Sequence, residues 1–315
     1  MKLFNHLQFK LLFFLIFGGG YHYAQIPTGY YSAAEGLNGM KLKSALNTII
    51  ADHIQFPYTS TNTDVWDILK ETDKDTIDPS KVILLFTGWT VDAAQEYNSG
   101  RGWTHEHVWA KSRGDFGTTL GPGTDVHALR PCDVSVNTAR SNRWFGCGDY
   151  EYMDSDGATG CYTSSSTWFW EPRDIVKGDV ARMIFYMATR YEGENGELDL
   201  FVIDSIPRDN KTKAPVHGKL SVLLQWHNED PVDDWERNRN EVIYSYQGNR
   251  NPFIDRPEFV EEIWGTYVGV ESFTKDEPKE LLMVVDVLGR EVEIEPGVLQ
   301  FYIYSDGSVE KRVKN

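Results

Sequence analysis

The chain has 315 residues and a formal net charge of −16 at pH 7, with 31 Lys and Arg residues against 47 Asp and Glu residues. Hydrophobic residues make up 41% and aromatic residues 13%, so the composition supports a substantial core and excludes a globally disordered chain. The length allows one large domain or two domains of ordinary size.

The N-terminal segment, residues 1–24, has the pattern of a secretory signal peptide. Lys2 and Lys10 give a basic start, residues 11–17 are uniformly apolar, and Ala24 precedes the expected cleavage site. The apolar run is shorter than the roughly 20 residues that span a bilayer, and no later segment is long enough. We therefore expect an exported monomer without a membrane span, located outside the cell or at its surface, with the periplasm as the alternative.

The spacing of apolar residues predicts the elements that follow. Residues 82–86 form an apolar run of strand length, and several other segments have helical spacing. Residues 247–252 are rich in turn-forming side chains, and we expect them to serve structure rather than substrate contact. Arg182 is expected to form a salt bridge within the fold. The predicted helices span residues 37–54, 179–191, 214–226 and 238–246.

The most informative pattern is the pair Glu106-His107, followed further along by Asn137. The carboxylate and the amide offer oxygen ligands of the kind that Mg²⁺ or Ca²⁺ prefers. Histidine has a reference pKa of ~6.5, so His107 can take a proton from water near neutral pH. We therefore predict a divalent metal site at Glu106 and Asn137, with His107 as general base. This combination suits hydrolysis of a phosphodiester bond.

The local structure should bring these residues together. The segment around Glu106 and His107 is expected to be extended, which puts the two side chains on opposite faces unless a bend follows. A short helix over residues 134–143 would place Asn137 and Arg140 on one face. That spacing puts a cation beside the metal ligand, so we predict that Arg140 clamps the scissile phosphate.

The charge around this motif differs from that of the whole chain. Between Arg101 and Arg143 there are six basic residues and four acidic ones. A locally basic region within an acidic chain predicts weak, salt-sensitive binding of a nucleic acid. We expect the remaining acidic residues to serve solubility outside the cell.

Seven segments carry a resemblance to a known family: Glu106-His107-Val108-Trp109-Ala110-Lys111-Ser112 and residues 29–31, 36–39, 125–131, 136–142, 177–182 and 247–255. They resemble the bacterial endonuclease I family, which comprises secreted or periplasmic nucleases of the His-Me finger (ββα-metal) superfamily. The resemblance implies an α+β fold, with a ββα-metal nuclease core and flanking helices over residues 25–272. It also implies the same roles for Glu106, His107 and Asn137, one bound Mg²⁺ (with Ca²⁺ or Mn²⁺ as alternatives), and DNA as substrate with little sequence specificity. RNA is a further candidate substrate.

The C-terminal segment, residues 273–315, differs in its residue pattern from the chain before it. A charged stretch at residues 275–280 is expected to be a linker, and alternating apolar residues predict strands at 281–287, 298–304 and 307–312. This tail resembles a type IX secretion C-terminal sorting domain, most closely at residues 287–292 and 307–311. The resemblance implies the secretion machinery as a partner. The alternative is an extra β-hairpin packed on the nuclease domain.

The cysteines leave two alternatives open. Pairing of Cys147 with Cys161, which enclose a loop rich in Gly, Asp and Ser, is favoured in an oxidising compartment. The alternative is that these two and Cys132 are buried free thiols, because free cysteine packs as a small hydrophobic residue.

Two other functions fit parts of the sequence. His105, His107, His127 and Cys132 have side chains that suit zinc, so a zinc hydrolase is one alternative. A secreted, non-catalytic nucleic-acid-binding or adhesion protein with a degenerate nuclease core is the other. Under the leading hypothesis Asp125 and His127 support the fold around the site.

Overall fold

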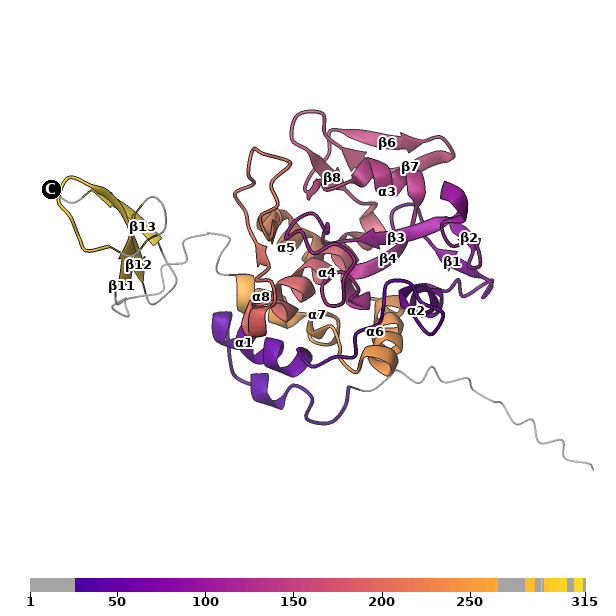
Figure 1. The fold of residues 1–315 in the computed structure, drawn as a ribbon, viewed down its shortest axis with the longest axis horizontal. Helices are drawn as coiled ribbons and strands as arrows, with labels where there is room; N and C mark the ends of the chain where they lie inside the picture. The colour runs from indigo at the N-terminus through magenta and orange to yellow at the C-terminus, as the bar shows by residue number, and fades with distance from the viewer. Residues whose placement is uncertain (1–25, 266–280, 287–289, 291, 305–308, 314–315) are drawn as a thin grey trace, which may run out of the picture. The chain divides into compact units, whose positions relative to one another are not determined.

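The computed structural model describes residues 26–265, 281–286, 290, 292–304 and 309–313 (Figure 1). They divide into two compact units, with the division between residues 268 and 269. The predicted signal peptide at residues 1–24, the predicted linker at 275–280 and the predicted domain boundary between 272 and 273 lie outside the described residues. No helix among the described residues is long and apolar enough to cross a membrane.

The larger unit is built around one buried helix, α4. Every residue of α4 from Gly178 to Arg190 is buried, and α1, α5 and α7 pack against it. A helix that is covered on all sides marks the centre of a sizeable core. The helices are α1 (Gly39–Ile50), α2 (Val65–Thr72), α3 (Val134–Arg140), α4 (Lys177–Arg190), α5 (Leu220–Glu229), α6 (Asp234–Gln247), α7 (Pro252–Asp255) and α8 (Glu258–Trp264).

The strands of this unit form small, separate sheets. Two pairs are antiparallel, β1 with β2 and β3 with β4, whereas β9 and β10 pair in parallel. The largest described sheet has the order β5-β8-β7-β6. The bounds are β1 (Lys81–Ile83), β2 (Thr90–Asp92), β3 (Trp103–His107), β4 (Leu129–Asp133), β5 (Trp144–Phe145), β6 (Tyr150–Asp154), β7 (Gly157–Thr163), β8 (Phe169–Glu171), β9 (Phe201–Val202) and β10 (Val216–His217).

The predicted ββα unit is formed by β3, β4 and α3. Glu106 of β3 lies opposite Arg130 of β4 in the antiparallel register. The chain passes from β4 directly into α3, and Asp133 caps the helix because its Oδ1 accepts hydrogen bonds from the backbone N–H groups of Ser135 and Val136. The α+β class predicted from the sequence is thereby confirmed.

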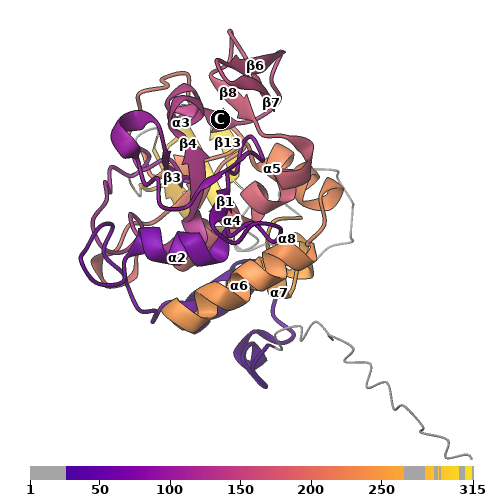
Figure 2. The same cartoon turned by 90° about the vertical axis from the view of Figure 1, so that its right-hand side faces the viewer.

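Helix α2 supports this unit from below in the view of Figure 2. Its Trp66 and Leu69 belong to a buried apolar cluster with Trp103 of β3 and Leu129 of β4. Full burial of a large apolar side chain contributes about 1.5–3 kcal/mol. The cluster therefore anchors the β3–β4 strand pair to α2.

Most of the predicted elements are present, but two differ in extent. The strand predicted at residues 82–86 ends at Ile83 in β1. The helix predicted at residues 214–226 begins only at Leu220. Val216 and His217 instead pair with β9, and the preceding Pro215 lacks the N–H that a helix interior needs. The apolar spacing of this segment was therefore misleading at its N-terminal half.

The predicted disulfide between Cys147 and Cys161 is wrong. All three cysteines are free, and Cys147 is exposed whereas Cys132 and Cys161 are buried. Alternation along β7 turns Cys161 into the core, where its thiol donates to the carbonyl oxygen of Phe86 over 3.1 Å. The alternative of three buried thiols is also wrong, because Cys147 lies at the surface.

The smaller unit is a three-stranded antiparallel sheet of order β11-β12-β13. Val284 and Tyr302 form its small buried cluster, and Val292 packs against them. All three strands predicted for the tail are present among the described residues. They are β11 (Leu281–Val285), β12 (Leu299–Tyr304) and β13 (Val309–Val313).

Candidate active site

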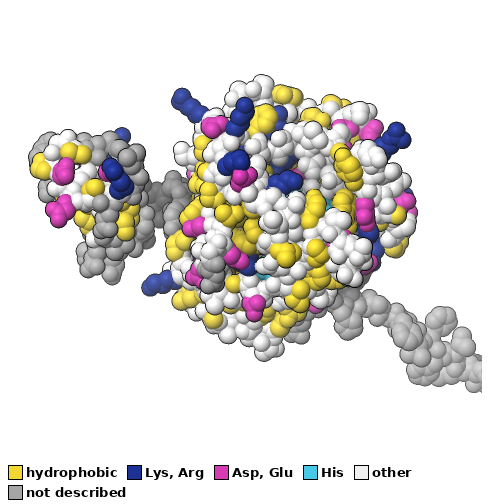
Figure 3. Space-filling model, viewed as in Figure 1, with side chains coloured by type: hydrophobic (Ala, Val, Ile, Leu, Met, Phe, Trp, Pro, Cys, Tyr) yellow, Lys and Arg dark blue, Asp and Glu magenta, His cyan; other side chains and the backbone are white. Residues whose placement is uncertain are grey.

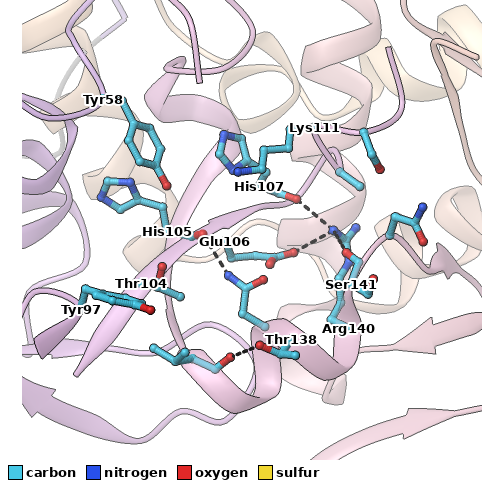
Figure 4. A pocket seen from close by; sticks show the side chains of 15 residues that line it. Tyr58, Tyr97, Thr104, His105, Glu106, His107, Lys111, Thr138, Arg140 and Ser141 are labelled. Carbon is cyan, nitrogen blue, oxygen red and sulfur yellow. Dashed lines mark hydrogen bonds and ion pairs between the residues drawn. The ribbon is translucent and has the colours of Figure 1, made fainter. Parts of the chain in front are cut away.

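A cleft of about 630 Å³ opens over β3 and α3 (Figure 4). It brings together Glu106 and His107 from the end of β3 with Asn137 and Arg140 from α3. The four residues predicted from the sequence therefore share one cavity. The lining also includes Tyr58, Tyr97, Thr104, His105, Lys111, Ser141 and Asn142.

His107 is held in one protonation pattern by the backbone. Its Nε2 lies 3.0 Å from the carbonyl oxygen of Gly123. Because a carbonyl oxygen only accepts, Nε2 must carry the proton, and the lone pair of the neutral ring is on Nδ1. Nδ1 has no hydrogen-bond partner among the described residues. Burial lowers the pKa of His107 to about 4, so the ring is neutral at pH 7.

Glu106 is almost completely buried beneath the cleft. Its Oε1 lies 3.0 Å from Nη1 of Arg140 and has no hydrogen-bond partner among the described residues. Burial raises the pKa of the Glu106 carboxyl to about 7, and the nearby Arg140 lowers it in part. A buried carboxylate whose ion pair with arginine lacks a hydrogen bond is a position where a further cation would be stabilising.

Asn137 presents its amide in a defined direction. Its Nδ2 donates to the backbone carbonyl oxygen of His105 over 2.9 Å. That carbonyl only accepts, so the amide nitrogen must face β3 and Oδ1 is left for another partner. The site thus offers one amide oxygen and one carboxylate, both hard oxygen donors.

Arg140 was predicted as a phosphate clamp, but its guanidinium is committed to protein acceptors. Nη1 donates to the backbone carbonyl oxygen of His107 over 3.0 Å, and Nη2 donates to that of Val108 over 2.6 Å. The side chain is buried and also lies 3.0 Å from Glu106. This geometry favours a role in positioning Glu106 and the end of β3. The clamp itself stays an untested prediction.

The donor set suits a hard divalent cation such as Mg²⁺. Carboxylate and amide oxygens are its preferred protein ligands, and two of them leave most coordination positions for water and phosphate. By contrast, among the described residues no three His, Cys, Asp or Glu side chains gather as a metal group. His127 lies elsewhere, with Nε2 3.3 Å from the carbonyl oxygen of Asn249, so the zinc alternative lacks its ligand set.

The residues expected to support the fold do so. The Asp125 carboxylate accepts hydrogen bonds from the hydroxyls of Tyr186 and Tyr191 over 2.9 and 3.1 Å. Arg182 pairs with Glu236 in the interior, as predicted. In the predicted structural turn, Asn249 donates to the carbonyl oxygen of Ile50.

Sequence reasoning missed four features of the cleft. Lys111 follows His107 in the same motif segment, is exposed and lines the cleft. Its place in the motif could have predicted a basic side chain at the site. Tyr58 stacks beside His107 at 5.9 Å between ring centroids. The other two are Tyr97 and the Gly123 carbonyl. Tyr58, Tyr97 and Gly123 carry no local signal, because the tertiary fold brings them to the site.

The ββα unit of β3, β4 and α3 thus carries a polar cleft with these side chains. The sequence pattern of the family described as Endonuclease I matches residues 38–258. This chain belongs to the endonuclease I family, and it is a nuclease and therefore a hydrolase.

Similar proteins carry names of both ribonucleases and deoxyribonucleases. The chain is 53% identical over 245 residues to the extracellular ribonuclease of Bacillus subtilis (strain 168), covering 77% of this chain and 80% of that protein. It is 52% identical over 236 residues to the extracellular ribonuclease of Bacillus amyloliquefaciens, covering 75% and 78%. It is 29% identical over 139 residues to an extracellular deoxyribonuclease of Aeromonas hydrophila, covering 42% and 49%.

Proposed function

We propose that this protein is a secreted, metal-dependent endonuclease that hydrolyses phosphodiester bonds in DNA and RNA with little sequence specificity. The observation that carries the proposal is the convergence of Glu106, His107 and Asn137 on one cleft. The names of the similar proteins support both nucleic acids as substrates and an extracellular location.

His107 acts as the general base. Its Nδ1 takes a proton from a water molecule as the water oxygen attacks the phosphorus, and the bond from phosphorus to the leaving 3′ oxygen breaks. The leaving oxygen takes a proton from solvent, while the Gly123 carbonyl holds the imidazolium through Nε2. A positioned base contributes about 10²–10⁴-fold to such a rate. Because the ring is neutral throughout the physiological range, no prior deprotonation is needed.

Glu106 and Asn137 would hold the divalent cation through a carboxylate oxygen and the amide Oδ1. When bound, Mg²⁺ supplies charge stabilisation to the phosphate and the leaving oxygen. Arg140 keeps the Glu106 carboxylate in place and partly neutralises it. Lys111, exposed at the cleft, is suited to attract the phosphate.

The test is cleavage of supercoiled plasmid and of a long RNA by purified residues 25–315, with Mg²⁺ and with EDTA. We expect Mg²⁺-dependent cleavage of both, and Asn137→Ala should require a higher Mg²⁺ concentration for the same rate. No cleavage by folded protein with Mg²⁺, Ca²⁺ or Mn²⁺ would favour the non-catalytic binding protein. Cleavage of RNA alone would restrict the substrate to that polymer.

A further inference from the structure

The two ends of α3 lie in surroundings of opposite charge. At its N-terminal end, the hydroxyl of Ser135 donates to the carboxylate of Asp154, which joins the helix to the β6–β7 hairpin over 2.6 Å. Residues 149–157 of that hairpin contain four acidic residues and no basic one. A nucleic acid strand that left the cleft in this direction would meet repulsion.

The C-terminal end of α3 lies beside a basic loop, which we define as residues 204–219 and which includes the short strand β10. This loop contains four basic residues, Arg208, Lys211, Lys213 and Lys219, against two acidic ones. Figure 3 shows blue side chains gathered over the place where Figure 1 draws the loop that leads into α5. In a chain with a net charge of −16 this concentration of positive charge is unusual.

The basic loop is fixed to the edge of the cleft. Asn142, which lines the cleft, donates from Nδ2 to the carbonyl oxygen of Asn210 over 3.1 Å. A second attachment is made by the N–H of Gly114, which donates to the carbonyl oxygen of Lys213 over 3.0 Å. The loop therefore continues the surface of the cleft rather than hanging free of it.

Two cations on the loop are available to a ligand. Arg208 and Lys211 are exposed, and neither forms an ion pair with a described residue. Lys213 differs, because its Nζ lies 2.7 Å from the Asp115 carboxylate. Exposed, unpaired cations beside a cleft that receives a phosphodiester are suited to further phosphates of the same strand.

We propose that the basic loop is a binding surface for the sugar-phosphate backbone of the substrate strand, which runs from the cleft past the C-terminal end of α3. Arg208 and Lys211 bind phosphates outside the cleaved bond, and the acidic β6–β7 hairpin disfavours the opposite path. This inference rests on the proposed nuclease function. It adds a direction to the bound strand and predicts that long substrates are preferred over short ones.

The test compares the double variant Arg208→Gln/Lys211→Gln with the matched control Lys41→Gln/Arg237→Gln, which removes two exposed charges from α1 and α6. Binding of a fluorescein-labelled 20-nucleotide single strand is measured by anisotropy at several salt concentrations, in Ca²⁺ and in EDTA. We expect the loop variant to bind about 10-fold more weakly at 50 mM salt and to have a shallower dependence of log K on log[salt] by about 1.4, because two phosphate contacts are lost.

Cleavage rates separate the roles of cleft and loop. In the loop variant, kcat/KM should fall more for the 20-nucleotide strand than for a dinucleotide, and Arg208→Lys/Lys211→Arg should restore the wild-type values. Equal binding and equal salt slopes in the loop variant and the control would overturn the proposal. A wild-type protein that cleaves nothing yet shows the loop effect in binding would overturn the nuclease function alone.

Discussion

Nε2 of His107 donates a hydrogen bond of 3.0 Å to the carbonyl oxygen of Gly123. This contact makes the orientation of the proposed base depend on the backbone of a loop between β3 and β4. Gly123 has no room for a side chain, because an added Cβ would lie 2.8 Å from the carbonyl oxygens of Gly117 and Thr119. The glycine therefore lets its own carbonyl reach the imidazole.

Gly123→Ala should lower cleavage activity by roughly 10-fold or more, because the shifted backbone no longer orients His107. Thr118→Ala, in the same loop but exposed, is the matched control. The measurement is kcat on plasmid DNA together with the melting temperature. If Gly123→Ala were folded and as active as Thr118→Ala, the carbonyl would have no orienting role.

The raised pKa of Glu106 predicts a pH-dependent stability. Folding favours the neutral carboxyl of Glu106. The stability that this group contributes is therefore fully present below its ordinary pKa of about 4.5 and is lost as the pH rises through its folded pKa of about 7. Glu106→Gln cannot ionise. In EDTA, the free energy of unfolding of Glu106→Gln minus that of wild type should therefore increase by about 3 kcal/mol between pH 4.5 and pH 8. Urea unfolding measures this, and a difference that does not change with pH would contradict it.

The contacts of Arg140 predict a large effect on stability. Arg140→Met removes the bonds to the carbonyls of His107 and Val108 and leaves the Glu106 charge without its buried partner. Loss of one member of such a pair costs about 3–5 kcal/mol. A residue that only clamped the phosphate would change KM and leave stability unaltered.

A double variant tests the coupling of the pair. Glu106→Gln/Arg140→Met should recover part of the stability that Arg140→Met loses, because the unpaired buried charge is gone. Additive losses of free energy in the two single variants and the double variant would show that the two residues do not stabilise each other.

The cysteines provide a chemical test of the fold. Only Cys147 is exposed, and burial raises the pKa of the Cys161 thiol to about 12 and that of Cys132 well above its ordinary value. A thiol reagent should therefore modify one residue rapidly in the native protein and all three in denaturant without reductant. Modification of only one residue in denaturant would reveal a disulfide.

Local patterns predicted much of this fold. The apolar spacing of α1, α4 and α6 located these helices within a few residues, and the Glu106-His107 pair with Asn137 located the cleft. In these cases the information lies within a few consecutive turns or in one short motif. The order of strand, loop and helix was accessible for the same reason.

The errors and the contacts that sequence reasoning missed have a common physical origin in tertiary structure. Spacing along the chain cannot tell that Cys161 faces the core while Cys147 faces solvent. It also cannot show that the Arg140 guanidinium donates hydrogen bonds to the backbone carbonyl oxygens of His107 and Val108. The carbonyl of Gly123 has no sequence signature at all, because every residue has a carbonyl.

The most direct measurement is single-turnover cleavage of supercoiled plasmid by wild type and His107→Ala in Mg²⁺, with Mg²⁺ affinity determined for both. The proposed mechanism predicts a rate lower by about 10²–10⁴-fold in His107→Ala and an unchanged Mg²⁺ affinity, because His107 is a base and not a ligand. Cleavage by His107→Ala at a rate close to that of wild type would contradict the mechanism and place the base elsewhere.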